Sequence, residues 1–164
     1  MSARTILLLL ACAGVAPANE VDLIDIYAGS WAVEITQADT PFSHAGIENT
    51  AIRNDCWHSG EFQVCHQYVD GKSVALLVFD CRAASTACAS YPITPESDGV
   101  HRATVSVEGR TVIYPWQEER EGGTIYFRVV NTITSHGRID YRREYSDDQV
   151  HWRTMATGHE TRLR

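Results

Sequence analysis

The sequence is short of basic charge. Its 164 residues include 14 lysines and arginines against 21 aspartates and glutamates, which gives a formal net charge of −7. Lysine is almost absent, with Lys72 as the single example. Because nucleic acids and anionic membrane surfaces attract proteins through clustered positive charge, this deficit argues against both as partners.

The sequence also lacks helical periodicity over almost its whole length. Residues 21–28 are predicted to form one or two helical turns that plug a barrel end. The rest consists of short alternating or apolar runs separated by turn residues, which is typical of antiparallel strands. No composition shift or repeat indicates a second domain. We expect an all-β, antiparallel up-and-down β-barrel of about ten strands, at residues 30–37, 49–57, 62–69, 73–81, 87–91, 100–107, 110–117, 124–134, 138–145 and 149–157.

A long apolar run is missing except near the N-terminus, where Thr5 to Val15 follows Arg4. Ala16-Pro17-Ala18 then supplies the small residues that a signal peptidase recognises. We expect residues 1–18 to be a cleaved signal peptide and 19–164 to be one secreted or periplasmic domain. The run is too short to serve as a membrane-spanning segment.

A lipid anchor is the alternative at this end of the chain. Leu9-Leu10-Ala11-Cys12 resembles a bacterial lipobox, which would place a lipid on Cys12. The apolar core before Cys12 is very short, so cleavage after Ala18 is favoured. Because the leader holds Arg4 and no acidic residue, its removal changes the formal charge from −7 to −8.

Four cysteines remain once the leader is removed, and this even number indicates disulfides in an oxidising compartment. Three pairings of the four are open. The local one is favoured because a turn at Gly60-Glu61 places Cys56 opposite Cys65, and a turn at 83–86 places Cys81 opposite Cys88. Together with His58, the first pair has zinc-ligand chemistry. Oxidation of the thiols excludes that site, so no metal is predicted.

Side chains alternate along a strand, so the turns decide which residues face the interior. Asp70-Gly71 is a strong hairpin signal and Asp147-Asp148 also fits a two-residue turn. In the second and third strands the more apolar face is assigned to the interior, and the face with the cysteines to the exterior. The predicted lining is Ala51, Arg53, Asp55, Trp57, Phe62, Val64, His66, Tyr68, Ala75, Leu77, Phe79, His101, Ala103, Val105, Val112, Tyr114, Trp116, Phe127, Val129, Asn131, Ile133, Ile139, Tyr141, Arg143, Tyr145, Val150, Trp152 and Thr154.

An apolar lining with a few polar groups is typical of a small-molecule pocket. Two alternatives stay open: a barrel filled by its own side chains, or inward charges that pair with one another. The predicted ligand-binding residues are Trp31, Trp57, Phe62, Tyr68, Phe127, Tyr141 and Trp152 for the apolar part of a ligand, and Arg53, His66, Asn131 and Arg143 for a polar head.

Catalysis is weakly indicated. Asp55 lies opposite His66 and could act with it as an acid–base pair in an isomerase or cyclase. No nucleophile or hydrolase motif accompanies the pair, so we expect a protein that is not an enzyme. His66 and His101 are the inward histidines that a haem iron would need. No haem attachment motif is present, and no cofactor is predicted.

Several segments carry a resemblance to a known group: Ala28-Gly-Ser-Trp31, Asn54-Asp-Cys-Trp57, Val64-Cys-His66, Tyr126 to Thr134, Tyr141 to Asp147, and His151-Trp152. Together they resemble uncharacterised secreted bacterial proteins with a lipocalin-like, calycin-type barrel. The resemblance implies a small apolar ligand. It also implies that an arginine near the last strand packs over Trp31, with Arg143 and Arg153 as candidates. Haem barrels related to nitrobindin share the ten-stranded form, but Ala32-Val33-Glu34 departs from their glycine pattern.

The leading expectation is therefore an exported barrel that binds a small hydrophobic or amphipathic molecule without catalysis. The barrel enzyme is one alternative. A second is an envelope interaction scaffold without a ligand, because Val74, Leu76 and Val78 are predicted to form an exposed apolar stripe.

Overall fold

The computed structural model describes residues 22–84, 86–96 and 99–164 of the chain. The predicted signal peptide, its cleavage after Ala18 and the alternative anchor at Cys12 lie outside these residues. The elements are α1 (Leu23–Tyr27), β1 (Gly29–Gln37), β2 (Gly46–Ser59), β3 (Phe62–Val69), β4 (Lys72–Ala84), β5 (Ala87–Ile93), β6 (Ala103–Glu108), β7 (Thr111–Arg120), β8 (Gly123–Ser135), β9 (Arg138–Ser146) and β10 (Arg153–Arg162).

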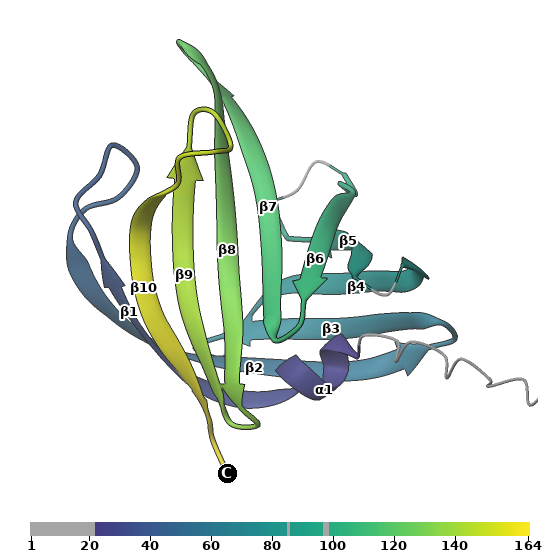
Figure 1. The fold of residues 1–164 in the computed structure, drawn as a ribbon. Helices are drawn as coiled ribbons and strands as arrows, with labels where there is room; N and C mark the ends of the chain where they lie inside the picture. Colours follow the sequence, from purple (N-terminus) through teal and green to yellow (C-terminus); the bar gives the residue numbers. More distant parts are fainter. Residues whose placement is uncertain (1–21, 85, 97–98) are drawn as a thin grey trace, which may run out of the picture.

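The ten strands form one closed antiparallel barrel (Figure 1). Each strand pairs with its neighbours in the chain, and β1 closes the barrel by pairing with β10, with Trp31 opposite Arg162. The predicted fold class, including the short helix at the N-terminal side, is confirmed. The Asp70-Gly71 hairpin is confirmed as well, because φ is 49° at Asp70 and 78° at Gly71, as the tight two-residue turn requires.

The last strand begins later than predicted. Residues 147–152 form a loop instead of a two-residue turn and the start of a strand. The Asp148 carboxylate accepts backbone N–H bonds from Val150 and His151, each at 2.8 Å, and the Ser146 hydroxyl accepts that of Gln149 at 3.0 Å. Such side-chain bonds to the backbone compete with strand pairing. The bounds predicted for the last strand, 149–157, are therefore wrong, and β10 occupies residues 153–162.

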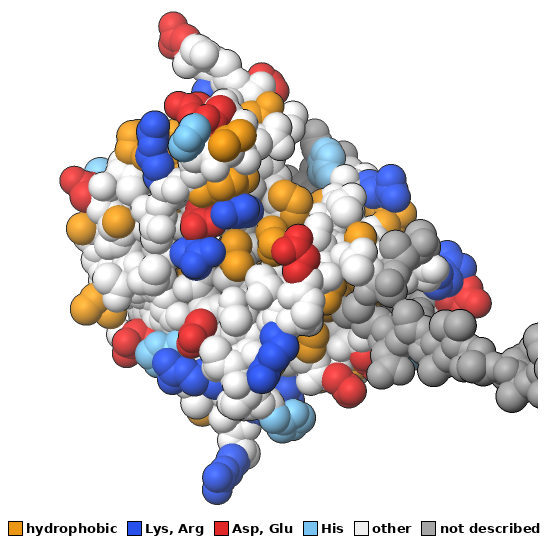
Figure 2. All heavy atoms as spheres, viewed as in Figure 1, with side chains coloured by type: hydrophobic (Ala, Val, Ile, Leu, Met, Phe, Trp, Pro, Cys, Tyr) orange, Lys and Arg blue, Asp and Glu red, His pale blue; other side chains and the backbone are white. Residues whose placement is uncertain are grey.

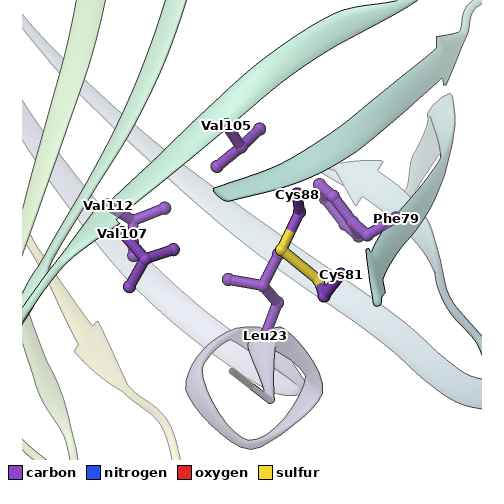
Figure 3. Close-up of a cluster of buried hydrophobic side chains, with 7 residues drawn as sticks. All are labelled: Leu23, Phe79, Cys81, Cys88, Val105, Val107 and Val112. Carbon is purple, nitrogen blue, oxygen red and sulfur yellow. A yellow bond between two sulfur atoms is a disulfide. The ribbon is translucent and has the colours of Figure 1, made fainter. Parts of the chain in front are cut away.

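The helix α1 closes one end of the barrel, against β2 and β3 (Figure 1). It begins at Asp22, whose carboxylate accepts the N–H of Ile24 at 2.9 Å, as an N-cap does. Leu23 points from the helix into the barrel and is completely buried against the Cys81–Cys88 disulfide (Figure 3). The residues packed around it are Phe79, Cys81, Cys88, Val105, Val107 and Val112. This packing makes α1 the apolar plug that the sequence predicts.

An arginine packs over Trp31, but it is neither of the predicted candidates. The guanidinium of Arg162 lies 4.4 Å from the centre of the Trp31 ring and donates to the carbonyl of Ala28 at 2.6 Å. Arg143 instead donates to the Gln37 amide oxygen at 2.9 Å, and Arg153 lies beside Tyr145. The candidates were wrong because the predicted last strand ended before residue 162.

The faces of β2 and β3 are the reverse of those predicted. Asn54, Gln63 and Cys65 are buried inside the barrel, whereas Trp57 and Phe62 are exposed on its outside. The inner face of these strands is polar because it binds the backbone of the plug. Asn54 Nδ2 donates to the Tyr27 carbonyl at 3.1 Å, and Gln63 Oε1 accepts the Leu23 N–H at 2.7 Å.

A β-bulge explains why the faces of β4 were nevertheless predicted correctly. Tyr68 pairs with Ser73 and Gln67 pairs with Ala75, so Val74 has no partner on β3. One extra residue in a strand reverses the phase of inward and outward positions. Ala75, Leu77 and Phe79 accordingly face inward, as predicted, although β3 is turned the other way.

Both disulfides have the local pairing that was favoured. Cys56 is bonded to Cys65, and Cys81 is bonded to Cys88, each pair with a Cα–Cα distance of 4.1 Å. Cys65 and Cys88 are buried, so both bridges face the interior and not the surface. Their presence is consistent with an extracellular or periplasmic location.

Candidate functional site

A cavity of about 320 Å³ lies inside the barrel above α1. Strands β2 to β8 and β10 supply its walls, and Tyr27 of α1 forms part of its base. Its lining residues are Tyr27, Ile52, Asn54, Cys65, Gln67, Leu77, Phe79, Ser90, Pro92, Ala103, Thr104, Val105, Tyr114, Pro115, Trp116, Asn131 and Glu160. The barrel is therefore not filled by its own side chains.

The upper wall of the cavity is apolar and aromatic. Leu77, Phe79 and Val105 face it from neighbouring strands. Trp116 stacks on Phe127 with ring centres 5.3 Å apart and is 40% exposed, so this edge of the cavity meets solvent. On the outer face drawn in Figure 2, basic and acidic side chains are interspersed, with no continuous area of one sign.

A loop covers part of the end opposite α1. Phe42, between β1 and β2, packs edge-on against Phe127 and Tyr145 with ring centres 5.3 and 4.8 Å apart. The loop is tied by the Thr40 N–H, which donates to the Ser43 carbonyl at 2.8 Å. Phe42 thus extends the apolar wall towards this end of the barrel.

The base of the cavity carries a hydrogen-bonded group of hydroxyls and an amide. The Tyr27 hydroxyl accepts from Asn131 Nδ2 at 3.1 Å and is hydrogen-bonded to the Tyr114 hydroxyl. Burial raises the pKa of both tyrosines well above the usual value, so both are neutral phenols. Asn131 is 6% exposed, and its Oδ1 has no hydrogen-bond partner among the described residues. Such unpaired buried groups are rare in folded proteins.

Glu160 on β10 is the carboxyl group of the cavity. It is 8% exposed, and within the described part of the chain it has no hydrogen-bond or ion-pair partner. Desolvation by burial raises the pKa of Glu160 to about 7. An unpaired buried carboxyl in a cavity is a candidate functional group.

Of the predicted ligand-binding residues, Asn131 lines this cavity. Trp31, Phe127, Tyr141 and Arg143 face the interior as predicted but lie beside the cavity. Trp31 is buried under Arg162, and Phe127 lies behind Trp116. Tyr141 and Arg143 follow Ile139 along β9, opposite Gly158 and Ala156 of β10. Their role in binding stays a prediction.

The remaining predicted ligand-binding residues face outward, and the prediction that they line the interior is wrong. Arg53 lies over the Tyr68 ring at 4.2 Å, and His66 contacts the same ring and hydrogen-bonds to Ser73 at 2.7 Å. The bulge at Val74 puts this whole group on the outer face. The other outward residues are Trp57 and Phe62, which are exposed, and Trp152, which stacks on Arg128 at 3.9 Å.

The predicted acid–base pair is also on the outside. Asp55 does lie opposite His66 in the register, but its carboxylate is half exposed and lies 3.3 Å from the Arg53 guanidinium. His101, the second predicted inward histidine, is exposed. No histidine is among the described lining residues, and the described chain contains no cluster of three or more metal-ligating side chains.

Glu160 was not among the predicted site residues, and Tyr27 was given no role in the site. Glu160 lay beyond the end predicted for the last strand. Tyr27 was placed in the plug without a contact to the cavity. The signal that identifies Glu160 is the register, because it pairs with Val33 and Ile139, which are buried.

Comparisons with known proteins support the fold and nothing finer. No family model matches the sequence, and no curated protein matches it. Among solved structures, the crystal structure of Rv2717c from M. tuberculosis is similar, with a TM-score of 0.50 and 13% sequence identity, over 91% of this chain and 99% of that chain. At this identity the likeness establishes a shared barrel architecture.

A search for membrane-spanning helices gave none in the described residues, where no helix combines the length and hydropathy that a span requires.

Proposed function

We propose that this protein is an exported barrel that binds a small amphipathic molecule in the cavity and does not transform it. The observation that carries the proposal is the cavity of about 320 Å³, with apolar walls and two polar groups, Asn131 Oδ1 and the Glu160 carboxyl, that have no partner among the described residues. Small-molecule sites have this composition and span roughly 300–1,000 Å³. The paired cysteines support export, because disulfides persist in oxidising compartments.

The walls supply the driving force for binding. Burying about 200 Å² of an apolar tail against Leu77, Phe79 and Trp116 contributes about 5 kcal/mol. Part of this is offset by the loss of translational and rotational freedom. The polar base then orients the molecule, because a buried polar atom is stabilised by acquiring a hydrogen-bond partner.

Binding without catalysis is supported by the chemistry of the lining. A nucleophile needs an adjacent base, and no histidine or lysine is among the described residues that line the cavity. Cys65 is bonded to Cys56, so it is not a free thiol. Ser90 is buried, with a hydrophobic neighbour, Phe79, opposite it on β4. Outside the cavity, the half-exposed Asp55 has no enclosed space in which to act.

The test is extraction of the native protein. The full chain is purified from its own host without detergent, denatured in organic solvent, and the released molecules are identified by mass spectrometry. The matched variants are Leu77→Trp, which fills the cavity, and Leu76→Trp, which adds the same side chain on the outer face.

A molecule released from the wild type and from Leu76→Trp, and lost from Leu77→Trp, supports the proposal. A cavity that releases nothing and takes up no amphipathic probe in solution contradicts it. If the released molecule is chemically converted during incubation with the protein, the protein is an enzyme and the second half of the proposal is wrong.

A further inference from the structure

We propose that the molecule held in the cavity carries a protonated amine, and that the Glu160 carboxylate and Asn131 Oδ1 bind it. This inference rests on the proposed function, because it names the head group of the amphipathic ligand. Both residues line the cavity, both are more than nine-tenths buried, and both offer an acceptor atom without a partner among the described residues.

The two free atoms are acceptors, so the ligand has to supply donors. Asn131 Nδ2 directs one N–H to the Tyr27 hydroxyl, which leaves Oδ1 as the free acceptor of this side chain. The Tyr114 hydroxyl is hydrogen-bonded to that same hydroxyl. An ammonium group has three donors and no acceptor, and therefore fits a base that presents a carboxylate and an amide oxygen.

The charge of the lining selects the sign of the head group. Among the described lining residues Glu160 is the one acidic side chain, and none is lysine, arginine or histidine. An anionic head group would have no counter-charge there and would be repelled by Glu160. A cation is favoured further by the aromatic rings of Tyr27, Tyr114 and Trp116, whose faces attract positive charge.

The nearest charged groups along the inner face do not neutralise Glu160. Arg162 lies two residues further on β10, but its guanidinium donates to the carbonyls of Ala28 and Ile26 in the plug. Arg143 donates to Gln37, and it lies on β9 opposite Ala156, four residues before Glu160. Within the described part of the chain, the Glu160 carboxylate thus remains available to a ligand.

The proposal has a pH dependence with a definite sign. Desolvation raises the pKa of Glu160 to about 7, and the titratable groups that face it are Tyr27 of α1, Tyr114 of β7 and Tyr141 of β9, with Glu48 of β2 further away beside Tyr141. The pKa of each tyrosine is raised by burial, so all three stay neutral. Amine binding requires the ionised carboxylate and therefore displaces a proton at pH 6.

The experiment compares three probes of equal length on the intact protein: octylamine, octanol and octanoate, measured by isothermal titration calorimetry at pH 8. We expect octylamine to bind at least tenfold more tightly than octanol, and octanoate to bind most weakly. Glu160→Gln should remove the preference for the amine and leave octanol binding within threefold. Glu34→Gln is the control, because it deletes one negative charge on the exposed face of β1.

A second measurement does not depend on any variant. Octylamine affinity of the wild type should rise about tenfold between pH 6 and pH 8, with proton release at pH 6 detected from the dependence of the heat on the buffer. Octanol affinity should not change over the same range.

The outcomes separate this inference from the proposed function. Equal binding of amine and alcohol, or a preference for octanoate, overturns the amine head group and leaves the binding cavity intact. An amine affinity that is flat with pH and unaffected by Glu160→Gln has the same consequence. Failure of all three probes, with nothing extracted from the native protein, overturns both.

Discussion

Two groups of polar side chains face the interior of this barrel, and they differ in one respect. Asn54, Gln63 and Gln67 on β2 and β3 are hydrogen-bonded to the plug or to one another. Asn131 Oδ1 and Glu160, on β8 and β10, have no partner among the described residues. Burial alone therefore does not mark a site. The first group uses its polar atoms to hold α1 and one another, whereas the second keeps acceptor atoms for a ligand.

The largest effect should come from removing the apolar anchor of the plug. Leu23→Ala leaves a cavity among Phe79, Val105 and Val112, and we expect the free energy of unfolding to fall by about 3 to 4 kcal/mol. Chemical denaturation of the oxidised protein measures this. An effect below about 1 kcal/mol would show that α1 is not held by the core.

The next largest effect is expected at Glu160, where a substitution should raise the free energy of unfolding, by an amount that depends on pH. The pKa of Glu160 is about 7 in the folded protein against an ordinary value of 4.5, so its ionisation destabilises the empty barrel. This cost is absent below the unfolded pKa, grows as the pH rises towards 7, and is complete above it.

Glu160→Gln should accordingly raise the free energy of unfolding by about 2 to 3 kcal/mol at pH 8 and leave it nearly unchanged at pH 4. Thermal and denaturant unfolding at the two pH values measure the difference. A variant that is destabilised at pH 8 would mean that the carboxylate has a stabilising partner, and the contrast between the two groups would fail.

A pair of identical substitutions sharpens the comparison. Asn54→Ala removes a donor to the Tyr27 carbonyl and an acceptor for Gln67, and should cost about 2 kcal/mol. Asn131→Ala removes one donor to the Tyr27 hydroxyl and also an unpaired oxygen, and should cost about 1 kcal/mol or less. Equal costs would contradict a difference in role.

The smallest effect is expected on the outer face. Arg53 lies over Tyr68 on the outside of the barrel and beside Asp55. Arg53→Ala should change the affinity for a cavity ligand by less than twofold and stability by about 0.5 kcal/mol. A large loss of binding, measured by calorimetry with the same probes, would show that this face takes part in the site.

The sequence was sufficient for the barrel, the plug and both disulfides, because these depend on local signals. Asp70-Gly71 specifies its hairpin, and Cys56 and Cys65 lie at matching distances from the turn at Gly60. Which residues line the interior depends on the alternation of inward and outward side chains. An error in this alternation at one position is carried into the strands that follow. The unpaired Val74 reverses the alternation between β3 and β4, and no glycine or proline at this position indicates a bulge in the sequence.

The rule that the more apolar face is the inner face failed for a physical reason. Inside β2 and β3 the polar side chains of Asn54 and Gln63 satisfy the backbone of a helix that inserts into the barrel end. Outside, aromatic rings are covered by arginines, as Tyr68 is by Arg53 and Phe62 by Arg82. Glu160 was not predicted for a different reason. The loop held by Asp148 and Ser146 stands where a two-residue turn was predicted, so the last strand begins and ends later in the chain.

The two disulfides have a consequence for how this chain folds. Each closes a short segment, with sequence separations of 9 and 7 residues, and joins strands that are already neighbours in the chain. The β1–β10 seam instead brings Trp31 to Arg162. Closing so long a loop costs entropy before any contact is made. We expect the oxidised hairpins to hold their registers early, and the seam that completes the cavity at Glu160 to form last.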